Sequence, residues 1–181
     1  MDTVVRQQFT ALYERHYGDV LRYALRRVDS ESARDVAAET FTVAWRRFEQ
    51  IPHDPLPWLY GVARRTLANE LRSERRRSQL AGRLAAAGVP TVQLDHADEV
   101  TTTAGIRVAL SCLAPRDQEV LQLIAWEDLD VAAAARVVGC STTAFKVRLH
   151  RARRRLFAAL AAQTAAHPED EHSLIFPEVP A

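Results

Sequence analysis

Residues 129–156 read LDVAAAARVVGCSTTAFKVRLHRARRRL, and this segment says more about the architecture than any other part of the chain. Asp130 can cap a short helix rich in alanine, and Gly139 suits the left-handed residue that commonly ends a helix. Ser141 can then cap a second, long and basic helix. A short helix, a three-residue turn with glycine and a long basic helix are typical of a helix-turn-helix.

The helix-turn-helix is predicted over 131–150. Its second helix, which follows Ser141, has an apolar side and a basic side. At about 100° per residue, Phe145, Leu149, Ala152 and Leu156 fall within a sector about 60° wide, so this side is expected to pack inward. The first turns of such a helix enter the DNA major groove. Candidates for base edges are Lys146, Val147, His150 and Arg151, and candidates for phosphates are Thr143 and Arg148.

The distribution of charge supports a polyanionic partner, although the net charge is only +1. Residues 58–83 hold seven arginines and two glutamates, and residues 136–155 hold seven basic residues and no acid. Such local basic blocks are typical of nucleic-acid binding. A solvated helix face is the alternative for the run 148–155, but the capped turn and the apolar register favour DNA contact.

Apolar residues recur with helical spacing along most of the chain and strand signals are nearly absent, which predicts an all-α fold. Helices are expected over 9–28, from Ser32 as N-cap to 48, from 58 into 75–77, over 104–112, and over 115–126. Pro52, Pro55 and Pro57 separate the second helix from the third.

The fold expected from this pattern is two small helical domains joined by a flexible linker. The first domain covers 1–78, the linker 79–103, and the second domain 104–162 with the helix-turn-helix. The segment 163–181 is acidic and is expected to be disordered, because few apolar residues interrupt its polar run.

The sequence lacks the motifs of metal-binding proteins, P-loop nucleotide-binding proteins and serine hydrolases. The two cysteines form no CxxC, the six histidines lie apart without metal-ligand spacing, and there is neither a P-loop nor a GxSxG. We therefore expect no metal, no cofactor and no enzymatic activity. The polar N-terminus and the absence of a long apolar run predict a cytoplasmic protein without membrane insertion.

Four motifs outside and inside the helix-turn-helix resemble one family. They are ARDVAAETF at 33–41 with AWR at 44–46, WLYGVAR at 58–64, LAPRDQEVL at 113–121, and FKVRLHRAR at 145–153. The first resembles the region 2 helix of the sigma-70 family in its extracytoplasmic-function (ECF) branch, and the second resembles the start of that family's promoter-melting helix. The third resembles the opening of region 4, and the fourth resembles the region 4 recognition helix. The resemblance spans about residues 9–160.

The resemblance implies a transcription-initiation factor that binds core RNA polymerase, on the clamp of the largest catalytic subunit and in the flap region, and then binds promoter DNA. It implies an anti-sigma factor as a further partner. The family's polymerase-binding surface corresponds to Asp35, Glu39, Thr40 and Trp45, although core packing is an alternative for Trp45. Asp35 and Glu39 repel each other at i, i+4, which a basic partner surface would relieve.

In the same family the helix after Trp58 binds the single-stranded −10 element, and the region 4 helix binds the −35 duplex. The −10 candidates by position are Arg64, Arg65, Asn69 and Arg72. The sequence departs from the usual family residues at Ala38, Arg65, Asn69 and Val147, which bears on promoter preference.

Two alternatives remain, one to the function implied by the resemblance and one to disorder at the end of the chain. A stand-alone helix-turn-helix regulator would explain 129–156, but neither the motif at 33–46 nor the first basic block. The acidic and apolar end of the chain, with acids at 169–171 ahead of Leu174, Ile175 and Phe176, could also act as an internal latch on a basic face.

Overall fold

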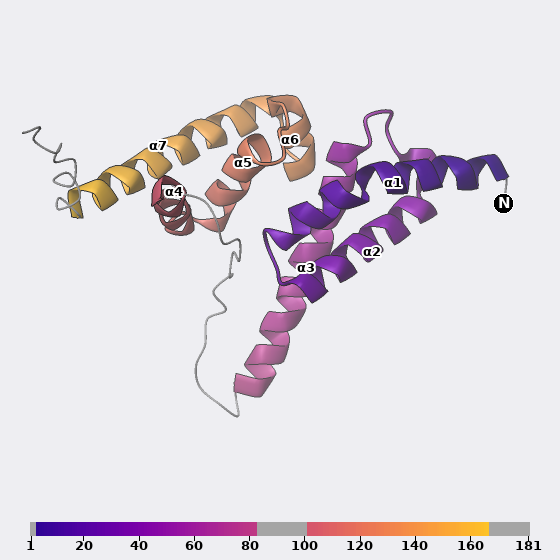
Figure 1. Ribbon diagram of the computed structural model, residues 1–181, viewed down its shortest axis with the longest axis horizontal. Helices are drawn as coiled ribbons and strands as arrows, with labels where there is room; N and C mark the ends of the chain where they lie inside the picture. The colour runs from indigo at the N-terminus through magenta and orange to yellow at the C-terminus, as the bar shows by residue number, and fades with distance from the viewer. Residues whose placement is uncertain (1–2, 83–100, 167–181) are drawn as a thin grey trace, which may run out of the picture. The chain divides into compact units, whose positions relative to one another are not determined.

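The computed structural model describes residues 3–82 and 101–166, with side chains described at 3–72 and 105–163. The regular elements of these residues are all helical, which confirms the all-α prediction (Figure 1). The predicted linker falls largely in 83–100, and the predicted disordered segment or latch falls largely in 167–181, both outside the described residues. The helices are α1 (Thr3–Leu25), α2 (Ser30–Arg46), a 3-10 turn (Phe48–Gln50), α3 (Leu56–Gly82), α4 (Thr101–Ser111), α5 (Pro115–Ala125), α6 (Val131–Val138) and α7 (Thr142–Ala166).

The chain divides into two compact units, each with its own core. The first comprises Met1–His96 with Leu129–Thr142, and the second comprises Ala97–Asp128 with Thr143–Ala181. In the first unit α1, α2 and α3 pack on one another, and α6 packs on α3. Arg136 of α6 also forms an ion pair with Asp54, with 2.8 Å between Nη2 and Oδ2.

Aromatic rings hold α1 against α2 in the first unit. The ring of Phe9 meets those of Phe41, Trp45 and Phe48 edge to face, with centroids 4.8–6.5 Å apart. Such edge-to-face pairs add to the stabilisation that comes from burying apolar area. Half-buried Trp45 therefore contributes to packing, as the alternative interpretation of this residue expected.

Tyr23 of α1 contributes a fully buried ring to the first unit. Its ring stacks on that of Tyr60 in α3, with centroids 4.9 Å apart, and the Arg27 guanidinium lies 3.6 Å from its centroid. Tyr13 of the same helix is instead 39 % exposed. The amphipathic ring of tyrosine allows either placement, and tertiary packing decides between them.

The N-terminus of α2 is capped by Asp29, and the prediction of Ser32 as the cap is wrong. The Asp29 carboxylate accepts hydrogen bonds from the backbone N–H groups of Glu31 and Ser32, each at 3.0 Å. Ser32 donates its hydroxyl to the same carboxylate at 2.7 Å. Donation from Ser32, by its backbone and its side chain, lowers the pKa of Asp29 below its ordinary value.

The third helix begins at Leu56 rather than at Trp58. Pro57 lies in its first turn, where a residue without an N–H leaves no intrahelical hydrogen bond unmade. The prolines therefore end the preceding segment but also help to start α3.

The second unit is built from α4, α5 and the body of α7. Its buried side chains include Leu110 from α4, Leu123 from α5, and Phe145 and Leu149 from α7. The turn between α4 and α5 is held by Gln118, whose amide donates to the carbonyl of Leu113 at 2.8 Å. Arg155 of α7 donates to the carboxylate of Asp117, a nearly buried residue of α5.

Candidate nucleic-acid and polymerase interfaces

Both ends of α6, the helix that precedes α7, are capped. Asp130 accepts a hydrogen bond from the N–H of Ala133 at 2.7 Å and so caps α6. Gly139 ends α6 with φ of 73°, a conformation that disfavours a side chain. The N–H of Cys140 returns to the carbonyl of Ala135 at 3.0 Å, which satisfies the helix end. The predictions for Asp130 and Gly139 are confirmed.

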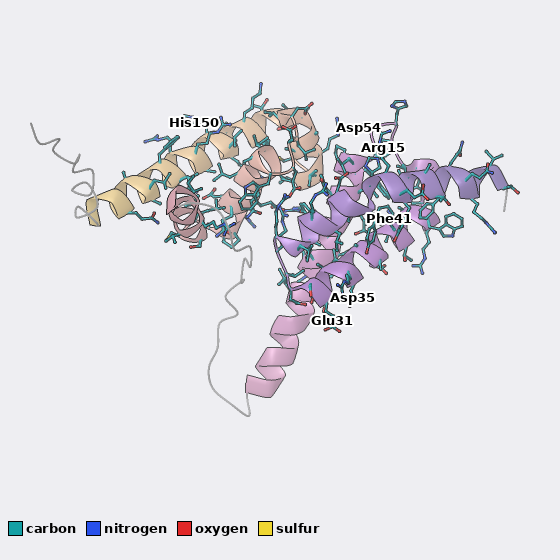
Figure 2. All side chains as sticks on the ribbon, viewed as in Figure 1. Arg15, Glu31, Asp35, Phe41, Asp54 and His150 are labelled. Atoms are coloured by element: carbon teal, nitrogen blue, oxygen red, sulfur yellow. The ribbon has the colours of Figure 1, made fainter. Side chains whose placement is uncertain are left out.

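The first turns of α7 separate an inward face from a solvent face. Phe145, Leu149 and Ala152 are buried, as their spacing predicted. The solvent face includes Val147, which is 46 % exposed. Each of the six predicted DNA-contacting residues is exposed: Thr143, Lys146, Val147, Arg148, His150 and Arg151. His150 is labelled in Figure 2.

The cations of this face are available to a partner. Among the described residues, Lys146, Arg148 and Arg151 make neither an ion pair nor a side-chain hydrogen bond, whereas Arg155 further along α7 pairs with Asp117. Cations without an internal counterion can neutralise phosphates. The start of α7 therefore offers a cluster of unneutralised positive charge on one surface.

An acidic stripe lies on the exposed side of α2. Glu31, Asp35 and Glu39 follow one another at i, i+4 spacing, and all three are exposed. Glu31 and Asp35 lie near each other on this helix (Figure 2). None of the three carboxylates has an ion pair within the described part of the chain. Glu31 was missed by the sequence interpretation, although its spacing from Asp35 could have revealed it.

Thr40 and Trp45, predicted on the same surface, lie differently. Thr40 is fully buried, and its hydroxyl donates to the carbonyl of Val36 at 2.7 Å. Its side chain therefore faces the interior of the unit in this structure. Trp45 is half-buried and packs on Phe9.

The predicted −10 residues share the middle of α3. Arg65, Asn69 and Arg72 are exposed and lie at helical spacing on one side of the helix. Arg72 donates to the side-chain oxygen of Asn69 at 2.6 Å, and Nε of Arg65 donates to the carbonyl of Gly61 at 3.0 Å. Arg64 is half-buried. The structure thus brings three of the four together and orients two of them toward each other.

The described residues contain no group of three or more histidine, cysteine, aspartate or glutamate side chains that could hold a metal ion. No described helix is both long enough and apolar enough to cross a bilayer.

Two segments of the chain match protein families. Residues 12–77 match the family described as Sigma-70 region 2, and residues 104–156 match Sigma-70, region 4. The ECF RNA polymerase sigma factor SigL of Mycobacterium tuberculosis is 34 % identical over 153 residues, which cover 81 % of this chain and 85 % of that protein. SigM of Bacillus subtilis, also an ECF sigma factor, is 27 % identical over 81 % of this chain and 91 % of its own length.

The fold is also shared with a solved sigma factor. RpoE of Bartonella quintana, solved in complex with the anti-sigma factor NepR, matches with a TM-score of 0.66 and 20 % identity, over 86 % of this chain and 98 % of that one. The presence of region 2 beside region 4 disfavours the stand-alone regulator. The chain belongs to the ECF branch of the sigma-70 family of RNA polymerase sigma factors.

Proposed function

We propose that the solvent face at the start of α7 reads the −35 element of the promoters that this sigma factor serves. The observation that carries this proposal is the exposed, internally unpaired set of Lys146, Arg148 and Arg151 beside a capped turn. Arg151 and Lys146 suit guanine O6 and N7, and Val147 suits a thymine methyl. Thr143 and Arg148 would hold phosphates, which fix the register of the helix.

The acidic stripe Glu31, Asp35 and Glu39 on α2 is proposed to bind core RNA polymerase, with half-buried Trp45 of the same helix as a further contact. Three carboxylates in i, i+4 series repel one another, and a basic partner surface would turn this cost into attraction. Thr40 would act from inside, as a buried residue beneath this surface whose hydroxyl bonds to the carbonyl of Val36 in the same helix.

For the middle of α3 we propose binding of the melted −10 strand. Arg65 and Arg72 would neutralise the backbone of single-stranded DNA, and Asn69, held by Arg72, would meet a base. Arg64 supports this surface from a half-buried position.

The functional division we propose is 1–78 for polymerase and the −10 element, 79–103 as linker, and 104–162 for the −35 element. Two modest contacts joined by a linker bind promoter DNA more tightly than either contact alone. The protein is proposed to act in the cytoplasm, without catalysis of its own. An anti-sigma partner, as in the complex of the Bartonella relative, is proposed as its regulator.

Run-off transcription with purified core RNA polymerase tests the proposal, on fragmented genomic DNA of the organism that carries the gene. Discrete start sites are expected only when the protein is present, with a shared sequence upstream of each. Combined replacement of Lys146 and Arg151 by alanine should abolish these transcripts, and replacement of exposed Arg116 on α5 should retain them. Salt-dependent duplex binding without any transcript would refute the proposed role.

A further inference from the structure

The second unit carries an apolar groove that no described side chain fills. It lies between α4, α5 and α7, has a volume of about 130 Å³, and includes Ile106, Leu121, Trp126 and Leu156 in its lining. An apolar cavity of roughly this size can take a benzene-sized group. Ile106 at its edge is 44 % exposed. Exposed apolar surface of this kind usually serves to bind something.

One segment of the same chain has the composition to fill this groove. Residues 174–176 read Leu-Ile-Phe, in a polar stretch after the end of α7. Acids at 169–171 precede them and a proline follows. An isolated apolar triplet next to acids matches a small apolar groove with a basic neighbour.

The end of α7 places this segment within reach. In the orientation that satisfies both the nitrogen and the oxygen of its side-chain amide, Gln163 donates to the carbonyl of Gly105 at 3.1 Å and accepts from the N–H of Ala109 at 2.9 Å. These bonds hold the last turns of α7 against α4, beside the groove residue Ile106. Eight residues from Ala166 to Leu174 can span about 26–29 Å, whereas Leu156 lies only about 15 Å back along the helix.

Charge complementarity supports the same placement. Residues 142–166 hold six Lys and Arg and no acid, and residues 167–181 hold four acids and neither Lys nor Arg. Arg153 lines the groove, is exposed, and has no ion pair among the described residues. Acids a few residues ahead of the apolar triplet would meet this arginine when the triplet is seated.

We propose that residues 174–176 fold back onto the groove between α4, α5 and α7, with one of their apolar side chains seated in it and the acids at 169–171 beside Arg153. The chain then carries its own ligand for this surface. Any external apolar partner of the groove has to displace that ligand before it binds, which weakens its apparent affinity. The inference does not depend on the assigned DNA or polymerase contacts.

Trp126 in the groove gives a direct readout by fluorine NMR of the full chain labelled with 5-fluorotryptophan. The chain has three tryptophans, and Trp126→Phe identifies the resonance of this one. Combined Leu174→Ser, Ile175→Ser and Phe176→Ser should shift that resonance and leave those of Trp45 and Trp58 in place, which also reports an intact first unit.

Two further variants separate the groove from the surface around it. Ile106→Glu places a charge at the edge of the groove and should reproduce the shift seen with the serine variant. Val108→Glu is the matched control, because Val108 is 55 % exposed on the same helix but does not line the groove. The control should keep the resonance of the unmodified chain.

Three results would overturn the proposal. The first is a Trp126 resonance that the serine variant leaves unmoved. The second is a resonance that moves with protein concentration, which would assign the groove to a second copy of the chain. The third is a shift produced by neutralising the acids at 169–171 but not by the serine variant, which would place the segment on the basic face instead.

Discussion

Arg151 of α7 shows how one side chain can be assigned from its surroundings. It is exposed and makes no ion pair within the described residues, and buried Leu149 and Ala152 on the same helix fix the direction of its face. A guanidinium in this position can form two parallel hydrogen bonds to O6 and N7 of guanine with its rigid, planar donor group. Its role is therefore expected to be specific rather than simply electrostatic.

Replacement of Arg151 by alanine should cost about 1–3 kcal/mol of binding to the preferred −35 duplex, because a bidentate base contact is lost. The variant should also discriminate less between the preferred duplex and a duplex changed at the base pair that Arg151 contacts. Titration of labelled duplexes that carry mapped promoters measures both effects. Arg116→Ala, at an exposed site on α5, is the control. Equal weakening on all duplexes would instead mark Arg151 as a phosphate contact.

The capping residues of α6 could be predicted from the sequence, whereas the N-cap of α2 could not. Asp130 and Gly139 were predicted correctly, because a cap and a left-handed residue at the two ends of one short helix leave few other arrangements. At α2, Asp29 and Ser32 are both acceptable caps, and the sequence alone does not decide which carboxylate or hydroxyl accepts the first N–H groups. The structure uses both, with Ser32 as a donor to Asp29.

Asp29→Ala should destabilise the first unit by about 1 kcal/mol near neutral pH, as is typical when an N-cap is lost. Because the folded state lowers the pKa of Asp29, the stabilisation is present above the ordinary aspartate value and is lost as pH falls through the lower folded value. The difference in unfolding free energy between the two proteins should therefore shrink below about pH 4. Urea unfolding at several pH values measures it. A difference that stays constant down to about pH 2 would contradict this ionic cap.

Gly139→Ala tests the turn before α7. The φ of 73° is strained for alanine, while the site has open space for its methyl group, so the cost is conformational only. We expect a loss of about 1 kcal/mol in unfolding free energy, seen as a lower urea midpoint with an unchanged slope. Gly18→Ala, at a helical glycine with ordinary φ, is the matched control and should be neutral or stabilising. No loss at Gly139 would mean that the turn relaxes.

On the scale of the whole molecule, periodicity predicted most of the helices and the inward face of α7, because burial along a helix repeats at a fixed spacing. Contacts between residues far apart in sequence were out of its reach. The pair of Arg155 with Asp117 joins residues 38 positions apart, and the Tyr23–Tyr60 stack joins α1 to α3. Burial of Thr40, a polar residue among the predicted polymerase contacts, likewise depends on packing between helices.

The acidic stripe of α2 leads to a prediction about the affinity of the whole protein for core RNA polymerase. Asp35→Lys combined with Glu39→Lys should weaken binding to core polymerase about tenfold or more, and the loss should be larger at low salt because exposed charges are screened. Binding to an isolated −35 duplex should not change. Glu14→Lys, at an exposed site on α1, is the control for a reversal of charge elsewhere. Undiminished polymerase affinity of the double variant would place that surface elsewhere.

In the proposed complex with DNA, the bond between Arg155 and Asp117 limits how many counterions α7 can release. Of its six basic residues, one is already neutralised by the protein, which leaves Lys146, Arg148, Arg151, Arg153 and Arg154. Each cation that replaces a condensed counterion steepens the dependence of affinity on salt by about 0.9 in a double-logarithmic plot. The contribution of α7 to that slope therefore stays below about 4.5, and Asp117→Asn would raise this ceiling by freeing the sixth cation.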